Sequence, residues 1–191
     1  MKIALVAAVT LIVFLASSAK VIDVGTEDQH TGVVAFDART SSGDDWEAIV
    51  AEIMADAVDV QSLDLSDLGA GKAVRLRGTV SGYSAKANGK KAVLTVVPDG
   101  HVGDGTFVVQ VGSIYTGTAV RDVQTVKAFG DFTNQTEWSQ YAKALNAQLH
   151  ELVVAPLALG EDAEGKTISL VGAATASGSE VTIVPVVLSV E

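Results

Sequence analysis

The feature that most constrains this chain is an alternating stretch followed by a tight-turn signal. Residues 74–80 read "VRLRGTV", in which apolar or small residues alternate with polar ones. A period of two places one kind of residue on one face of a strand, so this stretch predicts a strand with a single buried face. Asn88-Gly89 follows, and both residues tolerate positive φ, which makes the pair a strong hairpin signal. A second strand is predicted over 92–97, ending at the turn sequence Pro-Asp-Gly.

The elements after this hairpin suggest a barrel. A third strand is predicted over 106–111, and two more over 167–173 and 181–190, the last pair separated by an Ala-Ser-Gly-Ser loop. Between them lies a helix that begins at Asn134 with Glu137 three residues later, a variant of the capping box. Its predicted inner face consists of Trp138, Tyr141, Ala142, Leu145, Leu149 and Leu152. Three strands, a helix and two strands is the element order of an OB barrel, so we expect a mainly β fold with an OB-like five-stranded barrel.

Two glycines and an additional helix complete the expected domain. Gly78 and Gly172 lie inside predicted strands, where a small barrel bends sharply or packs closely. An N-terminal helix is predicted to begin at a Ser42 cap. Its apolar face at helical spacing consists of Trp46, Ile49, Val50, Ile53, Met54 and Ala57. We therefore expect an extended arm over residues 20–43 and a single OB-like domain with its N-terminal helix over 44–191.

The first nineteen residues resemble an export signal. Lys2 precedes an apolar run over residues 3–16, and small residues follow up to Ala19. The run is shorter than the ~20 residues that a spanning helix needs, and its flanks fit a secretory leader cleaved after Ala19. The alternative is an uncleaved anchor formed by residues 3–16. Both interpretations place the folded part outside the cytoplasm, in the periplasm or the extracellular space.

Charge and composition exclude several classes of function. Thirteen basic against 23 acidic residues give a net charge of −10, with no local Lys/Arg run, so nucleic acid is not an expected partner. The chain has no cysteine, which rules out disulfides, thiolate zinc sites and thiol nucleophiles. The histidines (His30, His101 and His150) lie far apart in sequence, and no metal site or cofactor is expected. No nucleophile elbow, paired-carboxylate site or phosphate-binding glycine loop is present, so we do not expect an enzyme.

One polar segment, residues 117–138, is the candidate site. The residues considered for ligand binding are Tyr115, Arg121, Asp122, Asp131, Asn134, Gln135 and Trp138. In one interpretation the polar side chains line a cleft for a sugar-like ligand, and Tyr115 or Trp138 stacks on a sugar face. In the other, Arg121 forks onto Asp131 or a backbone carbonyl and Asn134 caps the helix, so that the segment holds a turn in place. The second interpretation is favoured, because a capping role is visible and no reacting group is.

Three quoted segments resemble a known family. They are "QVGSIYTGTAVRD", "FGDFTNQTEWSQYAKALN" and "GKTISLVGAATASGSEVTIVPVVLSV". They resemble the predicted periplasmic lipoproteins called domain of unknown function 2291. The resemblance implies an envelope location and an OB-like barrel. It also implies envelope transport proteins as partners, since members look like neighbours of simple-sugar ABC import systems. No activity comes with the resemblance.

The chain departs from the family pattern at one place. Lipoproteins of this kind carry a cysteine directly after the leader, where a diacylglycerol is attached, whereas residues 15–19 here contain no thiol. The chain is then a soluble secreted form, an anchored form or an altered sequence, and it meets a membrane only through its N-terminal segment if that is retained. We expect an accessory or interaction protein of the envelope, associated with a simple-sugar import system. The alternative is a small-ligand binding module that uses the Arg121–Gln135 segment. Oligonucleotide binding rests on fold analogy alone, and the charge opposes it.

Overall fold

The structure is a computed structural model that describes residues 36–63, 68–69, 71–101 and 103–191. The expected leader (1–19) and most of the expected arm lie outside the described residues. Residues Phe36–Glu191 form one compact unit. None of the helices in these described ranges is both long and apolar enough to cross a membrane.

Five long strands of the described chain close into a barrel. They are β2 (Lys72–Lys86), β3 (Lys91–Pro98), β4 (Thr106–Gln110), β5 (Thr167–Ser177) and β6 (Glu180–Val190). Their order is β2-β3-β4-β6-β5, and pairing between β2 and β5 closes the cylinder. The β4–β6 pairing is parallel and the other barrel pairings are antiparallel. This is the strand order of an OB barrel, and the predicted fold class is confirmed.

The alternation seen in the sequence decides which side chains fill the barrel. Val74, Leu76 and Val80 are buried, while Arg75 and Arg77 point outward. The β2–β3 turn has positive φ at Ala87, Asn88 and Gly89, as the hairpin signal predicted. A short strand that was not predicted, β1 (Val58–Asp59), pairs in parallel with β2.

Gly78 and Gly172 lie where another backbone comes very close, as predicted. A Cβ at Gly78 would meet the carbonyl oxygen of Val97 and lie 2.8 Å from Cα of Pro98. A Cβ at Gly172 would meet the carbonyl oxygen of Val184 and lie 2.9 Å from Cα of Pro185. The pairing of β5 with β6 shifts register between Val171 and Gly172, so the strand bends at this residue.

Helix α1 (Ala38–Asp56) begins earlier than predicted. Its cap is Asp37, whose side chain accepts hydrogen bonds from the amides of Arg39 (2.9 Å) and Thr40 (3.3 Å). Ser42 is not the cap: it is buried within the helix and donates to the carbonyl of Arg39 at 3.1 Å. Residues 38–43 are therefore helical rather than part of an extended arm. The buried face is also narrower than predicted, because Met54 is 47% exposed.

The remaining helices lie between β4 and β5. They are α2 (Ala119–Val123) and α3 (Gln135–Leu149), followed by a π-helical turn, η4 (His150–Val154). Short 3₁₀ turns in the same stretch are η3 (Phe129–Asp131), η5 (Ala155–Leu157) and η6 (Glu161–Ala163), whereas the 3₁₀ turn η1 (Val60–Ser62) precedes β2. The predicted inner face of α3 is correct up to Leu149, but Leu152 is 53% exposed and Val154 is buried. A π-turn contains more residues than an α-turn, so it shifts the inward positions along the chain.

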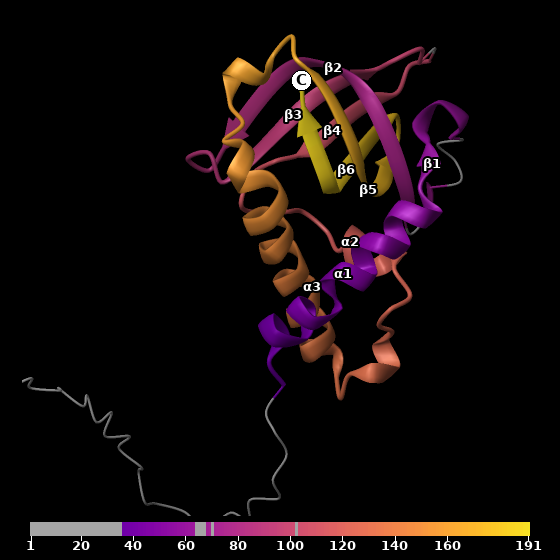
Figure 1. Cartoon of the computed structure of the whole chain (residues 1–191), viewed down its shortest axis with the longest axis vertical. Helices are drawn as coiled ribbons and strands as arrows, with labels where there is room; N and C mark the ends of the chain where they lie inside the picture. The colour runs from indigo at the N-terminus through magenta and orange to yellow at the C-terminus, as the bar shows by residue number, and fades with distance from the viewer. Residues whose placement is uncertain (1–35, 64–67, 70, 102) are drawn as a thin grey trace, which may run out of the picture. The chain divides into compact units, whose positions relative to one another are not determined.

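The helices pack together against the barrel. α1 crosses α3 (Figure 1), and α2 contacts α3 and β5. α1 also contacts β2 and β5. Trp46 and Ile49 of α1 and Leu145 of α3 belong to the same buried cluster as the barrel interior. The hydroxyl of Tyr141 joins the two helices by donating to Oδ2 of Asp45 at 2.8 Å.

Candidate functional site

Arg121 makes its polar contacts within its own helix. Its Nε donates to Oδ1 of Asp122 at 2.7 Å, and its Nη2 lies 3.2 Å from Oγ1 of Thr118. Oδ2 of Asp122 accepts from the Thr118 hydroxyl, which closes a three-residue network. The side chain of Arg121 is only 13% exposed. The expected fork onto Asp131 is wrong, because the adjacent carboxylate of Asp122 is within reach on the same short helix.

The guanidinium of Arg121 also covers a face of Trp138. Its Cζ lies 4.4 Å from the centre of the ring. Tyr141 stacks with the same ring at 6.1 Å with an interplanar angle of 11°, and Phe132 lies at 5.0 Å. Cation–π contacts of this kind stabilise by about 0.5–2 kcal/mol, depending on solvent exposure. Trp138 is therefore engaged by its neighbours rather than presented as a stacking platform.

Asp131 and Asn134 each satisfy backbone amides. Oδ2 of Asp131 accepts from the amide of Ala128 at 2.8 Å and closes η3. Oδ1 of Asn134 accepts from the amides of Thr136 (2.9 Å) and Glu137 (3.0 Å), so the predicted cap of α3 is confirmed. Glu137 in turn accepts from the amide of Thr133 at 2.8 Å. Gln135, the first residue of α3, is exposed.

Tyr115 lies apart from the other predicted residues. Its ring packs against His150 at 6.2 Å, beyond the end of α3, whereas Trp138 is in the first turns of that helix. His150 is twelve positions after Trp138 in the sequence. In a helix this corresponds to roughly 18 Å along the axis. Burial raises the pKa of the Tyr115 phenol well above its usual value. The structure thus brings Arg121, Asp122 and Trp138 together, and it does not bring Tyr115 to them.

A different region carries a groove: the outer face of the barrel. It encloses about 430 Å³. The lining residues are Ser84, Lys86, Lys91, Ala92, Val93, Val108, Gln110, Ile114, Thr116, Gly117, Thr175, Glu180 and Thr182. Pairing brings the strand residues onto one face, since Ser84 pairs with Val93 and Val93 with Gln110. In the next row Val108 pairs with Thr182. The groove could not be predicted from the sequence, because these residues have the pattern of the solvated face of their strands.

The groove has two rims and a fixed side wall. The β2–β3 hairpin contributes Lys86 and Lys91 to one rim, and Glu180 begins β6 at the other. Gln110 holds the segment after β4 in place through two hydrogen bonds to Thr116. Its side-chain nitrogen donates to the backbone carbonyl of Thr116 (3.1 Å), and its side-chain oxygen accepts from the backbone amide of Thr116 (2.7 Å). The groove thus lies between the β2–β3 hairpin and the β5–β6 hairpin. The strand faces between these two hairpins are the surface on which OB barrels bind ligands.

The groove provides hydroxyl groups, aliphatic surface and charge. Ser84, Thr175 and Thr182 supply hydroxyls, and Val93 and Val108 supply apolar surface. The residues that line it include no histidine and no aromatic side chain. No group of three or more metal-ligating side chains converges within the described ranges. The arrangement presents hydrogen-bonding groups, apolar surface and the charged side chains of Lys86, Lys91 and Glu180 to a ligand.

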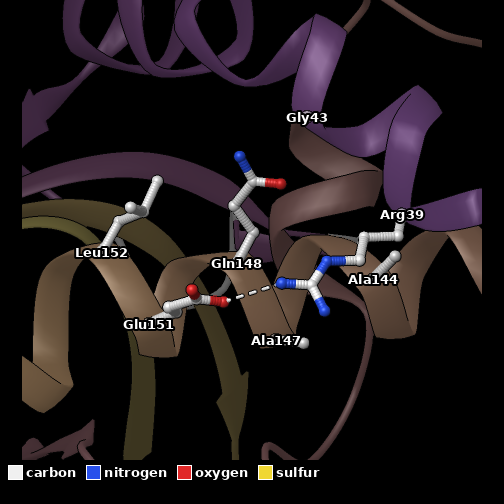
Figure 2. Close-up of a pocket in the computed structure, with 7 residues that line it drawn as sticks. All are labelled: Arg39, Gly43, Ala144, Ala147, Gln148, Glu151 and Leu152. Atoms are coloured by element: carbon white, nitrogen blue, oxygen red, sulfur yellow. Dashed lines mark hydrogen bonds and ion pairs between the residues drawn. The ribbon is translucent and has the colours of Figure 1, made fainter. Parts of the chain in front are cut away.

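A second hollow, of about 360 Å³, lies where α1 and α3 cross (Figure 2). Its lining includes three small residues, Gly43, Ala144 and Ala147. Nη2 of Arg39 reaches Oε2 of Glu151 across it at 3.4 Å, and both side chains are largely exposed. Exposed ion pairs of this kind contribute little to stability. We interpret this hollow as a consequence of helix crossing.

Comparison with known proteins agrees with this architecture. The structure is similar to the crystal structure of an OB-fold protein from Thermotoga maritima, with a TM-score of 0.53 and 13% sequence identity. The match covers 83% of this chain and 100% of the other chain, and at this identity it shows the fold alone. A sequence comparison with curated proteins gives no match. Residues 71–189 match the family model described as predicted periplasmic lipoprotein (DUF2291). Because the match spans more than half of the chain, from β2 into β6, the protein belongs to this family of predicted periplasmic lipoproteins.

Proposed function

We propose that this protein is a non-catalytic binding protein of the bacterial periplasm that holds a small polar ligand on the outer face of its barrel. The observation that carries the proposal is the groove between the β2–β3 hairpin and the β5–β6 turn. It lies on the strands that OB barrels use for binding. Its volume of about 430 Å³ falls in the range of small-molecule sites.

The lining favours a small solute over an oligonucleotide. Proteins that bind single-stranded nucleic acid stack bases on aromatic side chains within a basic groove. The residues lining this groove include no aromatic ring, and the chain carries a net charge of −10. Hydroxyl groups beside aliphatic surface are instead suited to a compact, partly hydroxylated molecule.

Within this proposal, the protein acts as an accessory component beside a simple-sugar import system. The family match supports only the periplasmic setting, and the hydroxyl groups of the groove are suited to a sugar-like solute. The Arg121–Gln135 segment is a weaker candidate for the ligand site. Arg121 and Asp122 bond to each other, and Asn134 is occupied as a helix cap.

The test is a pair of tryptophan substitutions combined with a ligand screen. Thermal unfolding of the full chain is measured against neutral sugars, sugar acids and amino acids. A ligand present at about 100 times its Kd stabilises the folded state by ~2.7 kcal/mol. We expect Thr182→Trp, in the middle of the groove, to abolish the stabilisation seen with the native protein.

Thr79→Trp is the matched control, because Thr79 is an exposed strand residue outside the groove. It is expected to keep the ligand response. The proposal fails if no solute stabilises the native protein, or if Thr182→Trp responds to the ligand as strongly as Thr79→Trp does.

A further inference from the structure

Three lysines lie at the β2–β3 hairpin, and two of them, Lys86 and Lys91, line one end of the groove. Lys86, Lys90 and Lys91 lie within six residues, and all are exposed. Lys86 and Lys91 are direct cross-strand partners in the β2–β3 pairing. The composition of the whole chain had indicated no local basic cluster, and the hairpin corrects that expectation.

This arrangement is unfavourable for the isolated protein. Like charges directly opposite each other on paired strands destabilise the pair. Of the eight other cations in the described ranges, Lys72, Arg75 and Lys143 form no ion pair, and the five that contact carboxylates are Arg39, Arg77, Arg121, Lys127 and Lys166. In the same described ranges, Lys86, Lys90 and Lys91 form no ion pair within 4.0 Å. A cluster of lysines that repel one another and have no carboxylate partner is a favourable binding site for an anionic ligand, although the chain as a whole carries a net charge of −10.

The two groove lysines share a face with the neutral lining. Lys86 lies two residues along β2 from Ser84, and Lys91 lies two residues along β3 from Val93, so these side chains alternate onto the same side. All four line the groove. The carboxylate of Glu180 lies on the other rim and disfavours an anion there. The groove is therefore polarised, with its positive end at the hairpin.

From this geometry we infer that the ligand is a small organic anion. Its carboxylate or phosphate group lies against Lys86 and Lys91, and its hydroxylated or aliphatic body extends over Ser84, Val93 and Val108. The inference rests on the proposed function, since it specifies the ligand class of the same groove. Charge-assisted hydrogen bonds to lysine are stronger than neutral ones, so the anionic group dominates recognition.

A second interpretation assigns these lysines to edge protection. Pairing of β2 with β5 covers Lys72–Thr79, so the end of β2 that carries Lys86 has a strand partner, β3, on one side only. Lysines on such an edge prevent pairing with another chain. This interpretation predicts that removing the charges changes the oligomeric state and leaves anion binding unaltered.

Calorimetric titration of the full chain with matched probes separates these interpretations. The probes are glucose, glucuronate and glucose 6-phosphate, which share a sugar ring and differ in charge; the last two distinguish a carboxylate from a phosphate source. We expect glucuronate or glucose 6-phosphate to bind at least about tenfold more tightly than glucose. Lys86→Gln with Lys91→Gln is expected to reduce that affinity by roughly tenfold or more. Lys143→Gln, an exposed lysine on α3, is the control and is expected to leave it unchanged.

Three results would overturn the inference. They are the absence of binding by both anionic probes, equal affinity for glucose and glucuronate, and unchanged anion affinity in the double lysine variant. If that variant instead associates into oligomers at unchanged affinity, the lysines protect an edge. If glucose and glucuronate bind equally well and Thr182→Trp abolishes that binding, the inference of an anionic ligand is rejected and the proposed function is retained. Binding by no solute of any class would reject both.

Discussion

At the residue scale, the polar segment before α3 is built from side chains that satisfy their neighbours. Asp131 and Asn134 each accept hydrogen bonds from backbone amides within three residues. Arg121 combines a charged pair with Asp122 and a contact over Trp138. Local hydrogen bonds from side chains to the backbone help to specify a single arrangement of a loop. Their residues stand out in the sequence as strongly as ligand-binding residues do.

Arg121→Ala is expected to destabilise the fold. It removes the contact with the Trp138 ring and leaves the half-buried carboxylate of Asp122 without its cation. We expect a loss of about 1–3 kcal/mol in the free energy of unfolding. Denaturant unfolding followed by tryptophan fluorescence measures it. Gln135→Ala, at an exposed position in the same segment, should change the free energy by no more than about 0.5 kcal/mol. Equal effects of the two substitutions would contradict a structural role for Arg121.

At the element scale, close backbone approach decides where the barrel strands bend. Gly172 lies at the register shift between β5 and β6, opposite Pro185. Gly82, also next to a register shift, lies in β2, and a Cβ there would be no closer than 3.9 Å to Thr95. Two glycines that look alike in the sequence therefore meet different constraints, because only Gly172 has another backbone within contact of its missing side chain.

Gly172→Ala should be among the most damaging single changes in the barrel. The added methyl group would overlap the carbonyl oxygen of Val184 and lie 2.9 Å from Cα of Pro185, and backbone cannot rotate away as a side chain can. A destabilisation of at least about 2 kcal/mol is expected, measured as the free energy of unfolding in urea. Gly82→Ala makes the same chemical change with space for the methyl group and should lie within about 1 kcal/mol of the native protein. A Gly172→Ala variant as stable as Gly82→Ala would show that the two strands can move apart.

At the scale of the whole molecule, the helices and the barrel share one core. Leu145 of α3 is fully buried in the cluster that also contains Ile49 of α1 and Leu170 of β5. Tyr141 ties α3 to α1 through Asp45. Since the barrel end and the helix layer bury each other's apolar surface, neither is expected to unfold alone.

Leu145→Ala tests this cooperativity. Loss of a fully buried leucine is expected to cost about 2–5 kcal/mol. The two tryptophans lie in α1 and α3, so fluorescence follows the helix layer while far-UV circular dichroism follows the whole unit. Both unfolding midpoints should fall together. Leu152→Ala, with a side chain that is 53% exposed, should leave them nearly unchanged. Separation of the two midpoints in Leu145→Ala would mean that the helix layer is an independent unit.

Elements whose causes are local follow from the amino-acid sequence alone. The period of two in β2, the Asn88-Gly89 turn and the Asn134 cap each depend on residues a few positions apart, and all are present in the structure. The order of these elements was sufficient to identify the OB barrel. Local signals were less decisive where more than one residue could cap a helix. Asp37 rather than Ser42 is therefore the N-cap of α1.

Which outward-facing residues lie close together depends on how the barrel closes. The groove combines residues of five strands, and its lysine pair depends on the register between β2 and β3. Likewise, the position of Tyr115 against His150 rather than near Trp138 depends on where the chain passes along α3. Register and packing arise from contacts between residues distant in the chain, so the outward positions of a strand look alike until the barrel closes and places some of them around a common groove.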